Sequence, residues 1–217
     1  MRRAGVERAE AYGGAFEKKS LHAAERDREE NHQRRETFLA KIRATPAERL
    51  IFLDESGVTT SMTRLYARRP DGRRIHEATP GGRWKIMTIV GGMRQSGITA
   101  AMTIEEATDG DIFLAYVKQV LGPTLATGDV VVMDNLGAHK VRGVEELIQA
   151  CGAEVLYLPP YSPDLNPIEK AWAKIKQRLR SQRPRTREAL EHAIADAIAR
   201  VTTEDAQAWF RLATVAL

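Results

Sequence analysis

The pattern of hydrophobic and polar positions predicts strands and helices that alternate through most of the chain. Three short apolar runs, of the kind that forms buried strands, occupy 49–56, 128–135 and 153–160. Two further apolar segments, 85–93 and 97–104, are separated by only three residues, which predicts a hairpin. Helical periodicity is expected at 21–43, 110–123, 139–152, 168–179, 186–201 and 203–214.

This order of elements predicts an α/β fold built on a mixed sheet. A hairpin followed by strand–helix alternation gives antiparallel and parallel strands in one sheet, with helices on both faces. Ligand chemistry on such sheets collects at the carboxyl ends of the parallel strands. We expect a charged helical lead-in with few core residues at 1–48, the main domain at 49–182, and a C-terminal helical extension packed on it at 183–217.

Length and composition exclude several classes of protein. The 217 residues suit one good-sized domain with a buried core. No apolar run approaches the roughly 20 residues of a membrane span, and the basic start is followed by polar residues rather than by the apolar stretch of a secretion signal. The single cysteine, Cys151, cannot form an internal disulfide and has no Cys or His cluster around it. We therefore expect a cytoplasmic protein without membrane contact.

Positive charge is concentrated in two windows of a chain whose net charge is only +4. Residues 64–85 carry a local charge of +5 and residues 170–187 a local charge of +8, so the remainder carries −9. Such windows are typical of a surface that binds a polyanion such as DNA, although a solvated basic helix face is an alternative for either window alone. The residues predicted to contact DNA are Arg64, Arg68, Arg69, Arg73, Arg74, Lys85, Lys170, Lys174, Arg178 and Arg185.

Three carboxylates stand where ligand chemistry is expected. Asp54 and Asp134 each end an apolar strand, and Glu169 opens the helix after the third strand. Three anionic groups at one sheet edge repel each other unless cations neutralise them, and ligation by oxygen alone selects ions such as Mg²⁺ or Mn²⁺. Two such ions about 3.5–4 Å apart can activate a nucleophile and stabilise the leaving oxygen of a phosphodiester. Taken singly, each aspartate also fits the role of a turn or cap residue.

The segment LPPYSPDLNPIEKAW, residues 158–172, braces Glu169 with four prolines. Proline fixes its own φ and pushes the residue before it toward extended conformations. Asn166 is therefore predicted to be an extended helix N-cap, with Pro167 at the first helical position and Glu169 completing a capping box. Two interpretations stay open: Glu169 only caps the helix, or the rigid helix start holds it as a metal ligand. Two neighbouring acids are assigned no chemistry, Glu55 on the opposite face of its strand and Asp164 as a solvated loop acid.

Three motifs, FLDESG, VVVMDNLGAH and LPPYSPDLNPIEKAW, resemble the signature of DDE transposases in their order and spacing. The resemblance is to the mariner superfamily, in its bacterial insertion-sequence branch (the IS-six-thirty group), and runs from about residue 18 to near the C-terminus. It implies a ribonuclease H-like (retroviral-integrase-like) catalytic domain at 49–182, with Asp54, Asp134 and Glu169 holding two Mg²⁺ or Mn²⁺ ions. It also implies DNA cleavage and strand transfer at insertion-sequence ends, with TA as the target, by a homodimer in the bacterial cytoplasm or nucleoid.

The same resemblance suggests roles for residues around the triad. Asn135 and His139 match the family's Asp-Asn…His pattern, which implies a place beside the metal ions or on DNA, although an ordinary loop or helix-start histidine fits His139 as well. Trp172 is expected in the core, whereas Trp84 either faces DNA or packs. Full-length relatives carry an N-terminal helix-turn-helix region, and only some 18 residues precede the matching segment here. We therefore expect the catalytic half of a split transposase, or a truncated copy, that works with a separate N-terminal helix-turn-helix protein.

Other functions fit parts of the sequence. A phosphatase of the haloacid dehalogenase type needs a second acid two residues after its first aspartate, where this chain has Ser56. An ATPase would need a G-x-x-x-x-G-K-[ST] loop, which the sequence lacks. A non-catalytic or domesticated DNA-binding remnant would keep the basic windows while tolerating the loss of a carboxylate. All three carboxylates are present, which favours the enzyme.

Overall fold

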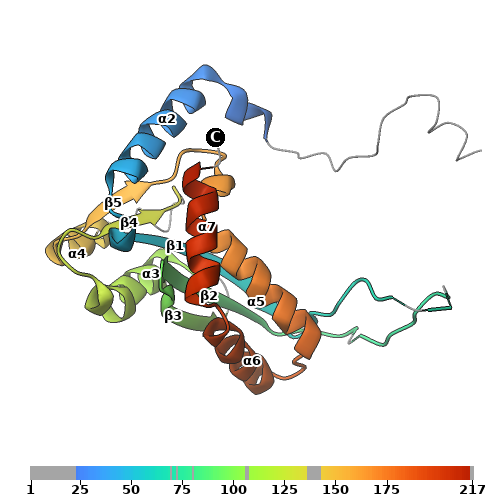
Figure 1. Ribbon diagram of the computed structural model, residues 1–217. Helices are drawn as coiled ribbons and strands as arrows, with labels where there is room; N and C mark the ends of the chain where they lie inside the picture. The colour runs from blue at the N-terminus through green and yellow to red at the C-terminus, as the bar shows by residue number, and fades with distance from the viewer. Residues whose placement is uncertain are drawn as a thin grey trace, which may run out of the picture.

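The centre of the protein is one five-stranded mixed sheet (Figure 1). The computed structural model describes residues 23–68, 70–71, 73–79, 81–105, 108–135 and 143–215. The sheet has the order β3-β2-β1-β4-β5, with strands β1 (Leu50–Thr59), β2 (Ile86–Arg94), β3 (Gly97–Glu105), β4 (Val130–Met133) and β5 (Glu154–Tyr157). β1, β2 and β3 are antiparallel neighbours, whereas β4 pairs parallel to β1 and β5 parallel to β4. The predicted hairpin and the predicted mixed sheet are therefore confirmed.

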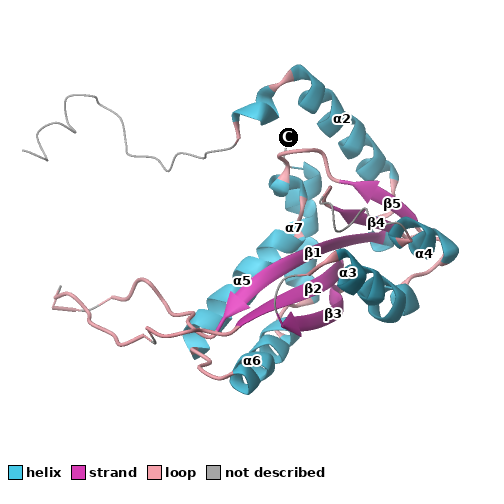
Figure 2. Ribbon diagram, turned by 180° about the vertical axis from the view of Figure 1, so that it is seen from behind, coloured by secondary structure: helices cyan, strands magenta, loops and turns pink. Residues whose placement is uncertain are grey.

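Helices cover both faces of the sheet. The α-helices are α2 (Glu29–Ala44), α3 (Gly110–Tyr116), α4 (Val144–Ala150), α5 (Ile168–Gln182), α6 (Arg187–Ala199) and α7 (Thr203–Val215). The shorter turns are η1 (Ala24–Asp27), η2 (Ala47–Arg49), the π-helical η3 (Val117–Leu121), η4 (Gly122–Thr124) and η6 (Pro163–Leu165). Figure 1 is seen from the side of α5 and α7, and Figure 2 from the side of α3 and α4. No helix in the described ranges is long and apolar enough to cross a membrane.

The alternation of side chains along β1 supplies two hydrophobic cores, one on each face of the sheet. Leu50 and Phe52 pack with α2, α5, α6 and α7, where the ring of Phe52 meets that of Phe210 edge-on with 5.2 Å between centroids. Ile51 and Leu53 pack with α3, η3 and α4 on the other face. Because β1 is buried on both faces, its sequence starts as a continuous apolar run.

Helix α2 belongs to the first of these cores. Its side chains Phe38, Leu39 and Ile42 are buried there, beside residues from α5 and α6. In the described part of the chain before residue 49, the buried apolar side chains are these three. Most positions of α2 are charged or polar, so the sequence shows little helical periodicity of apolar residues. The few apolar side chains still pack into the core beneath the sheet.

Three predicted elements differ in extent from the observed ones. β1 continues to Thr59, three residues beyond its predicted end. The helix predicted at 110–123 is α3, which passes into the π-helical turn η3 and then η4. Of the helix predicted at 139–152, the described part is α4, which follows Gly143 at a φ of +102°. Residues 136–142 lie outside the described ranges.

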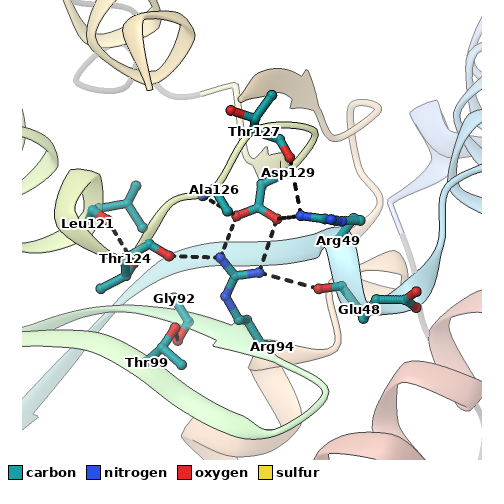
Figure 3. Close-up of polar contacts among 10 residues, drawn as sticks. All are labelled: Glu48, Arg49, Gly92, Arg94, Thr99, Leu121, Thr124, Ala126, Thr127 and Asp129. Atoms are coloured by element: carbon teal, nitrogen blue, oxygen red, sulfur yellow. Dashed lines mark hydrogen bonds and ion pairs between the residues drawn. The ribbon is translucent and has the colours of Figure 1, made fainter. Parts of the chain in front are cut away.

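A buried polar cluster closes the end of the sheet where β4 begins (Figure 3). Asp129 is 1% exposed and accepts hydrogen bonds from Arg94 at 2.6 Å and from the backbone N–H of Ala126 at 2.8 Å. Arg94 also donates to the carbonyl of Thr124, and Arg49 lies 3.7 Å from Asp129. The cluster ties the end of β2 to the start of β4. The candidate site described next lies at the opposite end of β4, just after Met133.

Candidate active site

The strand register places Asp54 level with Asp134. β1 and β4 pair in parallel up to Phe52 and Val132. Two residues further along each strand come Asp54 and Asp134, and neighbouring strands lie about 4.8 Å apart. Asp54 is inside β1 rather than at its end as predicted, because β1 continues alongside β2 after its pairing with β4 has stopped.

Glu169 reaches the same place through the proline-rich loop. The backbone N–H of Leu158 donates to the carbonyl of Met133, so the loop leaves the sheet directly beside Asp134. Asn166 is extended and Pro167 has helical angles, with φ of −65°, as predicted. No side-chain cap hydrogen bond forms at this helix start, so the prediction that Asn166 caps α5 was wrong. Glu169 is exposed in the first turn.

The three carboxylates line a single cleft of about 540 Å³. The residues that form it are Asp54, Asp134, Asn135, Leu158, Pro159, Pro160, Tyr161, Ser162, Pro163, Asn166 and Glu169. Asn135, which was predicted to lie beside the triad, is therefore in the cleft as well. His139 lies outside the described residues.

Electrostatics within the cleft favour cations. The pKa of Asp54 is raised from 3.8 to about 7. Burial is the largest cause and the negative charges of Glu169 and Asp134 add to it, whereas hydrogen bonds from the backbone of Glu55 and from Trp172 lower the pKa. Carboxylate oxygens that repel one another in one cleft are a donor set that fits hard divalent ions. Among the described residues, no three His, Cys, Asp or Glu side chains are arranged to hold a metal ion as they stand. A bound ion would therefore have to draw Asp54, Asp134 and Glu169 together.

Trp172 is a site residue that the sequence predicted only as core. Its side chain is 2% exposed, and its Nε1 donates a hydrogen bond to Oδ2 of Asp54 at 3.0 Å. Gly91 pairs with Asp54 in β2, and a Cβ there would lie 3.1 Å from Cη2 of Trp172. The available signal was the spacing of Trp172 three residues after Glu169, which puts both on one side of the helix.

Glu55 and Asp164, the two acids near the site to which the sequence assigned no chemistry, have different surroundings. Burial in the core on the α3 side raises the pKa of Tyr116, and the nearby charge of Glu55 raises it further. Glu55 therefore lies on the opposite face of the strand from Asp54, as predicted. Asp164 is not a solvated loop acid, because Arg35 and Arg26 bind it. Burial would raise the pKa of Asp164, but the hydrogen bond and charge of Arg35 and the charge of Arg26 outweigh burial and hold the pKa below its usual value.

Several residues predicted to contact DNA are engaged within the protein. Lys174 is paired with Asp205, and Arg178 with Asp196 at 3.1 Å. Arg185 donates to the backbone carbonyl of Thr60 at 2.9 Å. Arg64, in turn, donates to the hydroxyl of Ser181 at 2.7 Å. Lys174 and Arg178 thus bind α7 and α6, whereas Arg185 holds the connection between β1 and β2. DNA contact by these residues stays a prediction.

The other predicted DNA contacts are exposed. They are Arg68, Arg73, Arg74, Lys85 and Lys170, whereas Arg69 lies outside the described residues. Most of them lie on the connection between β1 and β2, which extends away from the sheet (Figure 1). Trp84 on this connection is 52% exposed, so it does not pack into the core.

Comparison with known proteins identifies the family. Residues 49–191 match the model of the DDE superfamily endonuclease family, which covers more than half of the chain, and the protein belongs to that family. No curated protein gives a match. Among solved structures, the chain is similar to the pre-cleavage Mos1 transpososome, with a TM-score of 0.77 and 18% identity over 97% of this chain and 67% of that one. The Mos1 catalytic domain gives a TM-score of 0.62 and 16% identity over 92% of this chain and 93% of that one.

These matches establish the fold. The mixed sheet flanked by helices is ribonuclease H-like, as the Mos1 structures show at an identity too low to carry more than the fold. The chain spans about two thirds of the Mos1 chain in its paired-end complex with the left transposon end, where it covers 66%. Further Mos1 paired-end complexes were solved with Mn and with Mg.

Proposed function

We propose that this protein is the catalytic part of a transposase that cuts DNA at the ends of a mobile element and joins those ends to target DNA. The observation that carries this function is the convergence of Asp54, Asp134 and Glu169 on one cleft in a DDE-family chain. These three side chains would hold two Mg²⁺ or Mn²⁺ ions. When bound, such ions activate the attacking oxygen and stabilise the leaving oxygen of a phosphodiester.

The protein's own residues prepare the cleft for this chemistry. Asp54 and Asp134 are carried by adjacent strands, so their spacing is set by the sheet rather than by a loop. Trp172 binds Oδ2 of Asp54 and so restricts the orientation of this carboxylate in the cleft. Because the pKa of Asp54 is raised to about 7, this carboxyl group is partly protonated near neutral pH, and cation binding would release the protons that remain.

The DNA partner is proposed from charge and from the relatives. The exposed basic residues between β1 and β2, with Lys170, are suited to phosphate contacts, which position a protein without reading sequence. By resemblance to the bacterial insertion-sequence branch of the mariner superfamily, we assign TA as the target and a homodimer as the working unit. Base-specific recognition of the element ends is assigned to a helix-turn-helix region of the kind that full-length relatives carry. The bacterial cytoplasm or nucleoid is the proposed location.

Metal-dependent nicking of plasmid DNA tests the function. The purified protein should nick DNA with Mg²⁺ or Mn²⁺ and not with EDTA, and Asp54→Asn, Asp134→Asn and Glu169→Gln should each abolish nicking. Glu36→Gln, the same chemical change at an exposed position of α2, is the matched control and should keep full activity. Nicking by folded Glu169→Gln at the wild-type rate would overturn the assignment. DNA binding by the wild type without nicking in either metal would instead identify a non-catalytic remnant.

A further inference from the structure

We propose that Arg35 on α2 is a positioning residue for the active site, because it clamps the loop 158–166 that leads to Glu169. This inference rests on the proposed function. Arg35 lies 129 residues before Asp164 in the chain, and its side chain is only 4% exposed. Nothing in the sequence around Arg35 distinguishes it from the other charged residues of α2.

The guanidinium of Arg35 holds the loop at two points. It donates to both carboxylate oxygens of Asp164, at 3.1 and 2.8 Å, and to the hydroxyl of Ser162 at 2.7 Å. That hydroxyl donates in turn to the carbonyl of Pro160 at 3.0 Å. A two-pronged contact of this kind restricts direction as well as distance. The clamp therefore reaches from α2 across to the wall of the cleft, which Ser162 and Pro160 help to form.

Leu158 and Leu165 anchor the loop near its two ends in the hydrophobic core, but the prolines limit backbone pairing of the segment between them. Its prolines lack N–H donors, so they cannot bond to a neighbouring strand. Tyr161 adopts a φ of +57°, a conformation that non-glycine residues keep only where their surroundings impose it. Arg35 and Arg26 supply ion pairs and side-chain hydrogen bonds that tie 159–166 to more distant elements. Arg26 contributes one ion pair to Asp164, at 3.2 Å.

An ion pair with one buried and one partly exposed partner, the side chains of Arg35 and Asp164 being 4% and 32% exposed, is better suited to fixing geometry than to adding stability. The energy of desolvating two charges largely cancels their attraction, so apolar residues of similar size can replace such a pair at little cost in stability. The position of a loop that carries a catalytic group is more sensitive, since a misplacement of about 1 Å can cost on the order of a hundredfold in rate. Removing the Arg35 contact should therefore reduce metal binding and nicking more than it reduces the stability of the protein.

The decisive variant replaces the charged pair by an apolar one, Arg35→Met with Asp164→Leu. Its melting temperature in EDTA should stay within a few degrees of wild type, while Mn²⁺ affinity measured by calorimetry and DNA nicking should each fall about 10- to 100-fold. The control is Lys41→Met with Glu154→Leu, which removes another ion pair between α2 and the body, at 2.7 Å, that does not touch the loop. This control should keep wild-type Mn²⁺ affinity.

Limited proteolysis gives a readout that does not depend on catalysis. Tyr161 is 50% exposed, and chymotrypsin should cleave after it several-fold faster in the Met–Leu variant than in wild type, with the cut identified by mass spectrometry. If the double variant has a much lower melting temperature than wild type, Arg35→Lys is the variant to use. Lysine keeps the positive charge but cannot make the two-pronged contact, and Mn²⁺ affinity and cleavage after Tyr161 are then measured in the same way. Wild-type Mn²⁺ affinity together with wild-type cleavage after Tyr161 would overturn the proposal. Nicking by Glu169→Gln would overturn the proposed function alone, because the proteolysis result stands without it.

Discussion

The indole Nε1 of Trp172 donates a hydrogen bond to Oδ2 of Asp54 across 3.0 Å. Trp172 comes from α5, one helical turn after Glu169, whereas Asp54 lies in the middle of β1. One helix therefore supplies one carboxylate of the cleft and orients another. The geometry of the site depends on how α5 packs against the sheet.

Replacing Trp172 by phenylalanine should separate this contact from core packing. Trp172→Phe keeps an aromatic ring but removes the donor to Asp54, so Mn²⁺ affinity should fall about tenfold or more, and stability by about 1–3 kcal/mol. Calorimetric titration with Mn²⁺ and thermal melting in EDTA measure the two effects. Trp209→Phe, the same change on α7, should leave Mn²⁺ affinity unchanged. If Trp172→Phe also binds Mn²⁺ like wild type, the indole serves only the core.

Two adjacent glycines in β2 allow a sharper comparison. An added Cβ would lie 3.1 Å from Trp172 at Gly91 and 3.1 Å from Ile51 at Gly92, on the other face of the sheet. Gly91→Ala and Gly92→Ala should therefore destabilise the protein by similar amounts, about 1–3 kcal/mol each. Only Gly91→Ala should reduce Mn²⁺ affinity and DNA nicking, because only it displaces Trp172 from Asp54. An equal loss of Mn²⁺ affinity and nicking in both variants would mean that these losses come from reduced stability and not from displacement of Trp172.

The raised pKa of Asp54 predicts an unusual dependence of stability on pH. The pKa of about 7 in the folded protein compares with an ordinary value of 3.8, so between these values the folded state binds a proton that the unfolded chain has released. Metal-free wild type should therefore lose stability as pH rises from about 4 to about 7, at up to about 1.4 kcal/mol per pH unit. Melting temperatures in EDTA across this range measure the effect. Asp54→Asn should lack this contribution, and superimposable profiles would contradict the prediction.

Salt dependence of DNA binding should distinguish free from engaged basic residues. Lys170 is exposed, whereas the ammonium of Lys174 is paired with Asp205. Lys170→Ala should reduce the slope of log affinity against log salt by about 0.9, the value for one lost phosphate contact. Lys174→Ala should change the slope less. Fluorescence anisotropy with a labelled duplex at several salt concentrations gives both slopes. An unchanged slope for Lys170→Ala would mean that Lys170 does not contact DNA phosphates.

Much of the fold could be predicted from local patterns. β1, β4 and β5 are apolar runs because both faces of the sheet are covered, and the hairpin of β2 and β3 is signalled by two apolar segments around a short polar turn. The prolines before Glu169 restrict the backbone locally, so the start of α5 could also be anticipated. That Asn166 makes no capping hydrogen bond could not be anticipated, because a side-chain hydrogen bond depends on what surrounds it in the folded protein.

The sequence by itself determined which carboxylates are candidates, since Asp54 and Asp134 each follow an apolar run and Glu169 follows the proline-rich start of a helix. Only the tertiary structure decided that they share one cleft, because that depends on the parallel register of β1 with β4 and on the packing of α5. The same holds for the supporting contacts. Trp172 reaches Asp54 across 118 residues and Arg35 reaches Asp164 across 129. Contacts over such separations arise from the packing of whole elements, which leaves no periodic or local trace in the chain.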